Sequence, residues 1–218
     1  VSGILLSAVP GFRLTAHKGV YVNYLAHFHL SHGHDDLLLG ALLGDFVKGP
    51  LTGQRSRSLE QGIMLHRKID AFTDSHPLVK QAHQAFSPNY RRYAGIMTDV
   101  VFDHFLNQHW DDFHDQPLQQ FSDQVYQLLA GNDRLTEPAL QMAGILEKYR
   151  LFEAYQHWQT VESALQRIGQ RIKGDNPLDS ASDELRRHYG EMEATFLDFY
   201  PVLQQHAKNT RATFLLGN

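Results

Sequence analysis

The sequence predicts an all-α fold, a single-domain multi-helix bundle of roughly eight helices. Apolar residues recur at helical spacing almost everywhere from Asn23 onward. No run of alternating β-branched residues is long enough for a strand, and no internal repeat is present. With 218 residues, 42% of them hydrophobic and 20% charged, the chain suits one ordered domain with a sizeable core.

Caps and prolines set the bounds of the predicted helices. Asp35 and Asp36 can cap the apolar run LLLGALLGDFVK, which stops at Gly49-Pro50. Prolines at the first turn are expected to introduce several later helices. In order, we expect helices over about 37–48, 58–75, 77–86, 89–110, 117–131, 138–155, 160–173 and 183–206.

The N-terminal segment differs from the rest of the chain. Residues 1–21 show no sustained hydrophobic periodicity and contain Pro10 and Gly11, so we expect a poorly ordered extension before a domain at 22–218. The segment lacks the basic stretch of a signal peptide. No apolar run approaches the roughly 18–20 residues that span a bilayer. A cytoplasmic protein with no membrane span is therefore expected.

Composition limits the chemistry. The chain has no cysteine, which excludes disulfides, thiolate zinc sites, iron–sulfur clusters and a cysteine nucleophile. Its 14 histidines and 24 acidic residues remain as metal ligands. The net charge of −4 argues against nucleic-acid binding, which normally needs a basic face.

Acidic residues on apolar helix faces are the most informative feature. Ile96, Asp99, Asp103 and Leu106 share one stripe of the helix expected over 89–110. Two like charges at i,i+4 repel, and burying them uncompensated is costly. A metal ion between the two carboxylates, or an Arg or Lys from another helix, would offset this repulsion and the cost of burial. His104 follows on the same turn and could reach the site from its edge.

A second helix has the same design. Ile63, His66, Asp70 and Asp74 lie on one arc, and His66 with Asp70 at i,i+4 can bind one ion. The same pair could be an ordinary surface ion pair. Asp45 ends the apolar run before Phe46 and is a third candidate ligand, or the cap of a neighbouring helix.

Most other histidines are not expected at this site. His27 and His29 point about 200° apart on a helix, so only one can face it. His27 shares helical spacing with Asn23 and is the candidate ligand. The others are expected to be exposed, capping or packing residues: His29, His32, His34, His109, His114, His157, His188 and His206.

The proposed ligands and a nearby basic segment both favour phosphoryl chemistry. A mixed histidine and carboxylate shell suits Mn²⁺, Mg²⁺ or Fe²⁺ better than structural zinc. The segment from 48 to 68 carries a local charge of +4, from five basic residues and one acidic residue. It is either a solvated loop or a site that attracts an anionic substrate or an acidic protein. The candidate residues for this role are Lys48, Arg55, Arg57 and Arg67.

Five stretches carry a family resemblance. NYLAHFHLSH (23–32), LLGDFVKG (42–49), GIMLHRKIDAFTD (62–74), MTDVVFDHFLNQHW (97–110) and RRHYGEMEATFLDFYP (186–201) resemble the acyl carrier protein phosphodiesterases. The resemblance runs from about Val22 to about Lys208, with the motifs in the same order. Family members begin with Met at the position of Val22.

This resemblance implies a function and a site. The implied reaction is hydrolysis of the phosphodiester that joins 4′-phosphopantetheine to a serine of holo acyl carrier protein, with Mn²⁺. It also implies a distant, rearranged relation to the HD phosphohydrolases. The family's L-x-D-F element falls on Asp45, its H-R-x-I-D element on His66 and Asp70, and its D-x-x-x-D-H element on Asp99, Asp103 and His104.

The expected mechanism follows from these residues. A subset of the acids and His66, with His27 or His104 adjacent, holds a metal whose bound water attacks phosphorus. A site carboxylate or histidine accepts the proton, and His104 is a candidate proton donor to the leaving alkoxide. Two alternatives remain: an HD-type phosphohydrolase acting on a nucleotide, and a non-enzymatic helical adaptor whose carboxylates are salt-bridged.

Overall fold

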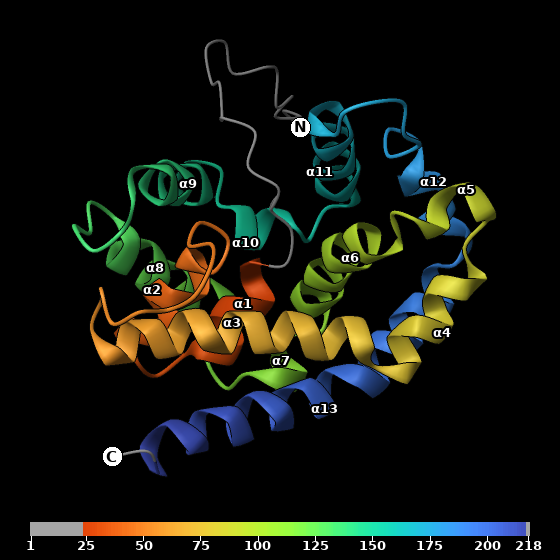
Figure 1. Cartoon of the computed structure of the whole chain (residues 1–218). Coiled ribbons are helices and arrows are strands. Elements are labelled where there is room, and N and C mark those ends of the chain that lie inside the picture. The colour runs from red at the N-terminus through yellow and green to blue at the C-terminus, as the bar shows by residue number, and fades with distance from the viewer. Residues whose placement is uncertain (1–23, 217–218) are drawn as a thin grey trace.

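The computed structural model describes residues 24–216, with side chains as far as Phe214, and this part of the chain holds thirteen helices and no strand (Figure 1). The all-α prediction is confirmed. The predicted extension at 1–21 lies outside the described residues. The helices are α1 Tyr24–Ser31, α2 Asp35–Leu43, α3 Arg57–Ser75, α4 Pro77–Ala85, α5 Pro88–Arg91, α6 Ala94–Gln108, α7 Trp110–Phe113, α8 Leu118–Leu129, α9 Glu137–Lys148, α10 Leu151–Ala154, α11 Trp158–Arg171, α12 Ala181–Arg187 and α13 Tyr189–Leu216.

The prediction of about eight helices was too low because local breaks divide three of them. The helix expected over 89–110 is broken between α5 and α6, and the one over 183–206 between α12 and α13. Arg150 adopts the left-handed conformation (φ 48°) and separates α9 from α10. The apolar run of α2 ends at Leu43 rather than at residue 48, so Asp45 lies in a turn. The structure also adds α1 and α7.

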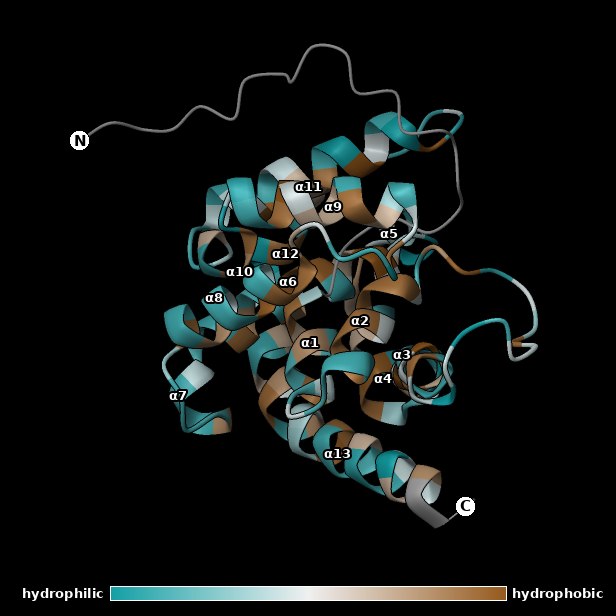
Figure 2. Cartoon of the chain, turned by 90° about the vertical axis from the view of Figure 1, so that its left-hand side faces the viewer, coloured by the Kyte–Doolittle hydropathy of each residue, from teal (hydrophilic) through white to brown (hydrophobic). Residues whose placement is uncertain are grey.

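The short helix α1 lies at the centre of the fold. All eight of its residues are buried. It contacts α2, α3, α6 and α13, which surround it in Figure 1. In Figure 2, coloured by hydropathy, the ribbon of α2 is mostly brown (hydrophobic), whereas much of the ribbon of α7 and α8 is teal (hydrophilic). Side chains on opposite faces of α1 therefore meet different parts of the protein.

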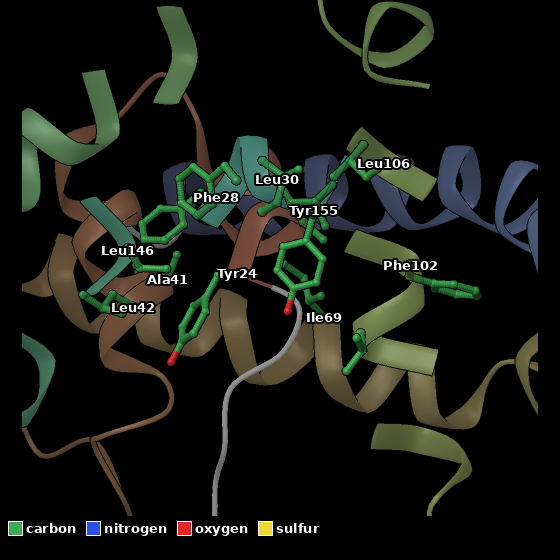
Figure 3. Packing of buried hydrophobic residues seen from close by; sticks show 14 of the residues in the cluster. Tyr24, Phe28, Leu30, Ala41, Leu42, Ile69, Phe102, Leu106, Leu146 and Tyr155 are labelled. Carbon is green, nitrogen blue, oxygen red and sulfur yellow. The ribbon is translucent and has the colours of Figure 1, made fainter. Parts of the chain in front are cut away.

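Several helices contribute to one continuous core. Figure 3 shows Phe28 of α1 near Leu42 of α2, with Ile69 of α3, Leu106 of α6 and other buried side chains in the same cluster. None of the helices in residues 24–216 has both the length and the apolar composition required to cross a membrane.

Two glycines set the contact between α2 and α3. A Cβ on Gly40 would lie 2.5 Å from the Cα of Gly62, and a Cβ on Gly62 would lie 2.8 Å from the carbonyl oxygen of Asp36. Real Cβ atoms do not approach other atoms this closely, so both positions require glycine. The backbones of α2 and α3 consequently touch, and Asp45 at the end of α2 comes near His66 of α3.

Candidate functional site

Helices α1 and α3 bring His27, His66 and Asp70 together. His27 Nε2 lies 3.0 Å from Asp70 Oδ1, and His66 Nε2 lies 3.2 Å from Asp70 Oδ2. One ligand atom from each of the three side chains lies within 4.8 Å of the others. The i,i+4 spacing on α3 aims His66 and Asp70 at one point, as the sequence predicts, and α1 supplies the second imidazole.

The imidazole of His66 is held in a fixed orientation. Its Nδ1 lies 2.8 Å from the carbonyl oxygen of Ala41, to which a protonated Nδ1 donates. Nε2 then points toward Asp70 and is the nitrogen available to a metal ion, the arrangement commonly found for metal-bound histidines. Gly44 makes this orientation possible, because a Cβ there would lie 2.2 Å from Cγ of the His66 ring.

The ring of His27 is buried and stacks on the ring of His66. The two centroids are 3.8 Å apart and the planes differ by 12°. His27 is 1% exposed, and neither of its ring nitrogens makes a hydrogen bond, although Nε2 lies close to Asp70. Burial, and then the charge of His66, lower the pKa of His27. His27 is therefore a neutral imidazole at pH 7, with a lone pair available to a metal ion.

Asp70 faces both imidazoles and solvent. Burial alone would raise its pKa, but the imidazoles of His27 and His66 beside it lower the pKa overall. In the opposite direction, burial would lower the pKa of His66, and Asp70 and Asp45 raise it above its ordinary value. The side chain of Asp70 is 45% exposed, so the cluster is open to solvent on the side of this carboxylate.

Asp45 lies beside the cluster, in the turn that ends α2. Its Oδ1 is 3.8 Å from His66 Nε2. A carboxylate at a helix C-terminus is unfavourable unless a positive charge lies nearby. Arg67, the residue after His66, donates to the carbonyl oxygens of Val47 and Gly49 at 2.7 and 2.9 Å and so holds the loop that follows Asp45.

Asp99 of α6 faces the same acidic region. Partial burial, and then the charges of Asp70 and Asp74, raise its pKa well above the ordinary value, and Asp103 and Asp45 add to this effect. Four carboxylates thus add to the effect of burial on Asp99. Such a concentration of acids near two histidines favours a bound cation.

Asp103 has partners that the sequence analysis did not consider. Its Oδ2 accepts the backbone N–H of Leu25 at 2.9 Å, and its Oδ1 accepts that of Ala26 at 3.0 Å. These two groups belong to the first turn of α1, whose N–H groups have no partner within the helix. The fully buried carboxylate therefore caps the N-terminus of α1, and the two capped residues directly precede His27. A metal-binding role for Asp103 stays a prediction.

His104 is not part of the cluster formed by His27, His66 and Asp70. Its Nδ1 lies 2.7 Å from the carbonyl oxygen of Tyr155, and its Nε2 lies 3.1 Å from the hydroxyl of Tyr189. Burial lowers the pKa of His104. Both ring nitrogens are thus engaged in packing α6 against the segments that carry these tyrosines, and its role as an acid stays a prediction.

The basic segment lies in the loop after Asp45 and at the start of α3. Lys48 and Arg57 are exposed, and Arg55 is partly exposed. Arg67 is occupied with the loop carbonyls, which makes it a positioning residue in this structure. Sequence reasoning missed this role, and also the need for glycine at position 44, because each depends on contact between α3 and the end of α2.

Comparison with known proteins identifies the family. A family model described as acyl carrier protein phosphodiesterase matches residues 22–203. A protein of that name from Pectobacterium atrosepticum is 36% identical over 189 residues, covering 86% of this chain and 98% of the relative. Proteins of the same name from Yersinia enterocolitica and Serratia proteamaculans are 36% and 35% identical over 190 residues, with the same coverage.

No solved structure matches the chain significantly, so the expected relation to the HD phosphohydrolases stays a prediction. The family match covers every motif that forms the cluster of His27, His66 and Asp70, as well as Asp45 and Asp99. The chain therefore belongs to the acyl carrier protein phosphodiesterase family.

Proposed function

We propose that this protein hydrolyses the phosphodiester between 4′-phosphopantetheine and a serine of holo acyl carrier protein, in a reaction that depends on a divalent metal ion. The observation that carries the proposal is the convergence of His27, His66 and Asp70 on one point, with Asp45 beside it. The names of the relatives supply the substrate.

The side chains fit a divalent ion. His27 is buried, and its ring nitrogens have no hydrogen bond, which is costly unless another partner satisfies them. The Nδ1 contact between His66 and Ala41 directs Nε2 at Asp70. Two imidazoles and a carboxylate are a donor set suited to Mn²⁺ or Fe²⁺, with Mg²⁺ a weaker match.

Each residue then has a defined task. His27, His66 and Asp70 would hold the metal, which when bound lowers the pKa of a coordinated water. Asp99, whose pKa is raised by burial and then by the surrounding acids, would accept the proton of the attacking water at a carboxylate oxygen. As the bond between phosphorus and the serine oxygen breaks, that proton would pass to the departing serine oxygen. Asp45 would bind or orient the same water from the end of α2.

Basic residues near the site would attract the carrier protein. Lys48 lies three residues after Asp45 and is exposed, and Arg57 begins α3 on the other side of the loop. Acyl carrier protein is an acidic partner in this proposal, so these charges would accelerate encounter more than they stabilise the transition state. Lys48→Glu should accordingly raise KM with little change in kcat.

The test uses the full chain with holo acyl carrier protein, and mass spectrometry measures release of the apo form. We expect release with Mn²⁺, its loss in EDTA, and recovery on adding Mn²⁺ back. His66→Gln and Asp70→Asn should abolish release, while His34→Gln and Asp183→Asn, at exposed positions away from the cluster, should retain it.

Other outcomes would contradict the proposal. Turnover of nucleotides without release of apo carrier protein would identify an HD-type phosphohydrolase instead. Binding of carrier protein without turnover under any metal condition would favour an adaptor. Full activity in both His66→Gln and Asp70→Asn would refute the assigned site.

A further inference from the structure

Three histidines converge on the face of α1 that is turned away from His27. His29 and His32 lie three residues apart at the C-terminal end of α1, and His114 follows α7. One ligand atom from each imidazole lies within 4.8 Å of the others. The ring centroids are separated by 5.1 to 5.7 Å. Sequence reasoning missed this cluster because His114 is remote in the chain.

Hydrogen bonds orient two of the rings as metal-bound histidines are oriented. His32 Nδ1 lies 2.6 Å from the carbonyl oxygen of His29, which leaves Nε2 of His32 for a ligand. His29 Nδ1 lies 2.7 Å from the hydroxyl of Tyr200. Its Nε2 lies 3.2 Å from the carbonyl oxygen of Phe113, a contact that a coordinate bond can replace. Polar partners behind a ligating ring fix its tautomer and direction.

His114 needs one local change. Its Nδ1 accepts the backbone N–H of Gln116 at 3.0 Å, which places the imidazole proton on Nε2. Coordination therefore requires that this hydrogen bond break or that the ring turn over. His114 is only partly buried and lies in the segment between α7 and α8, where such a rotation displaces little of the core.

A pocket gives access to the cluster. His29 and His32 line a cavity of about 700 Å³ between α1, α3 and α13, together with Lys208 and Arg211. A fourth donor, water or a small anion, can enter from this side, and the two cationic side chains favour an anion. Three imidazoles without a carboxylate are the donor set of zinc sites with an open position, and they discriminate against Mn²⁺ and Mg²⁺.

We propose that His29, His32 and His114 form a separate site for Zn²⁺ or another late transition metal, which fastens the end of α1 to the segment after α7. This site does not depend on the proposed function. Its donors are all nitrogen, whereas those near Asp70 are mixed, so the two sites should differ in metal preference.

Co²⁺ distinguishes the two sites directly. Four-coordinate Co²⁺ has intense visible absorption, whereas six-coordinate Co²⁺ absorbs weakly. Titrating the full chain with CoCl₂ should give the intense bands, and Zn²⁺ should displace them. His32→Gln and His114→Gln should lose the bands, whereas His34→Gln and His66→Gln should keep them. Zn²⁺ should also raise the melting temperature of the wild-type chain but not of His114→Gln.

The proposal fails if the wild-type chain shows no intense bands, or if both His32→Gln and His114→Gln retain them. It also fails if His66→Gln alone removes them, since the signal would then come from the cluster at Asp70. Circular dichroism of each variant establishes that it is folded, and neither His32 nor His114 is a fully buried side chain.

Discussion

Removal of the Asp103 carboxylate should uncouple the start of α1 from α6. The two backbone N–H groups that it accepts, of Leu25 and Ala26, are buried in the first turn of α1. Leaving a buried donor without its acceptor costs about 1–3 kcal/mol. Asp103→Ala orphans two such donors, so we expect a loss of roughly 2–6 kcal/mol. Asp103→Asn keeps one acceptor and should lose about half as much.

Urea denaturation followed by circular dichroism measures this effect. With an m-value of about 3 kcal/mol per molar urea, the Ala variant should shift the midpoint down by roughly 0.7–2 M without a change in slope. Ser122→Ala is the matched control. Its hydroxyl is equally buried but donates to Leu118 within α8, and its loss should cost about 1 kcal/mol.

Activity gives a second measurement of the same contact. His27 follows the capped residues directly, so fraying of α1 should displace its ring from His66 and reduce turnover in the Ala variant. The capping argument is refuted if Asp103→Ala is no more destabilising than Ser122→Ala. It is also refuted if the Ala variant is destabilised but its urea midpoint equals that of the Asn variant.

Three further predictions concern other parts of the site. Gly44→Ala should displace the His66 ring and lower metal affinity more than about tenfold. The control Gly144→Ala, on an open face of α9, should leave metal affinity unchanged. Isothermal titration calorimetry measures the metal affinity of both variants. Asp99→Asn relieves repulsion between acids, so thermal denaturation should show the metal-free variant to be about 1 kcal/mol more stable. The same variant should bind cations more weakly. A less stable metal-free variant would contradict the prediction of acidic repulsion. Burial lowers the pKa of His104, so the folded state binds fewer protons than the unfolded state. The free energy of unfolding should therefore fall as pH drops below about 6.5. Urea denaturation at several pH values should show that His104→Gln reduces this dependence on pH by at most about 1.4 kcal/mol per pH unit. Equal pH dependence in the wild-type chain and the variant would disprove this prediction.

The fold class and part of the site could be predicted because they depend on local spacing. The i,i+4 relation of His66 and Asp70 fixes their direction once α3 forms, and α3 begins and ends close to the predicted residues. That only one of His27 and His29 can face this cluster also follows from helical geometry, since α1 turns the two rings to opposite faces.

Contacts between segments could not be predicted. The stripe that carries Asp103 correctly indicates a buried acid that needs a positive partner, but a helix N-terminus supplies that partner as well as a cation does. His104 shares a motif with Asp103, yet its bonds to Tyr155 and Tyr189 join it to residues about 50 or more positions away. The helix break at Arg150, a non-glycine residue with a φ of 48°, likewise has no glycine or proline at that position to predict it.

The contact between Gly40 and Gly62 has a consequence for how this protein can change over time. Where side chains separate two helices, each substitution in the core alters the spacing between them. Here main-chain atoms meet directly, so the separation of α2 and α3 is fixed by van der Waals contact between the two backbones. The surrounding core can accumulate substitutions of different volume while Asp45 and His66 keep their mutual position. The robustness of the candidate site's geometry is thus concentrated in two residues that have no side chain.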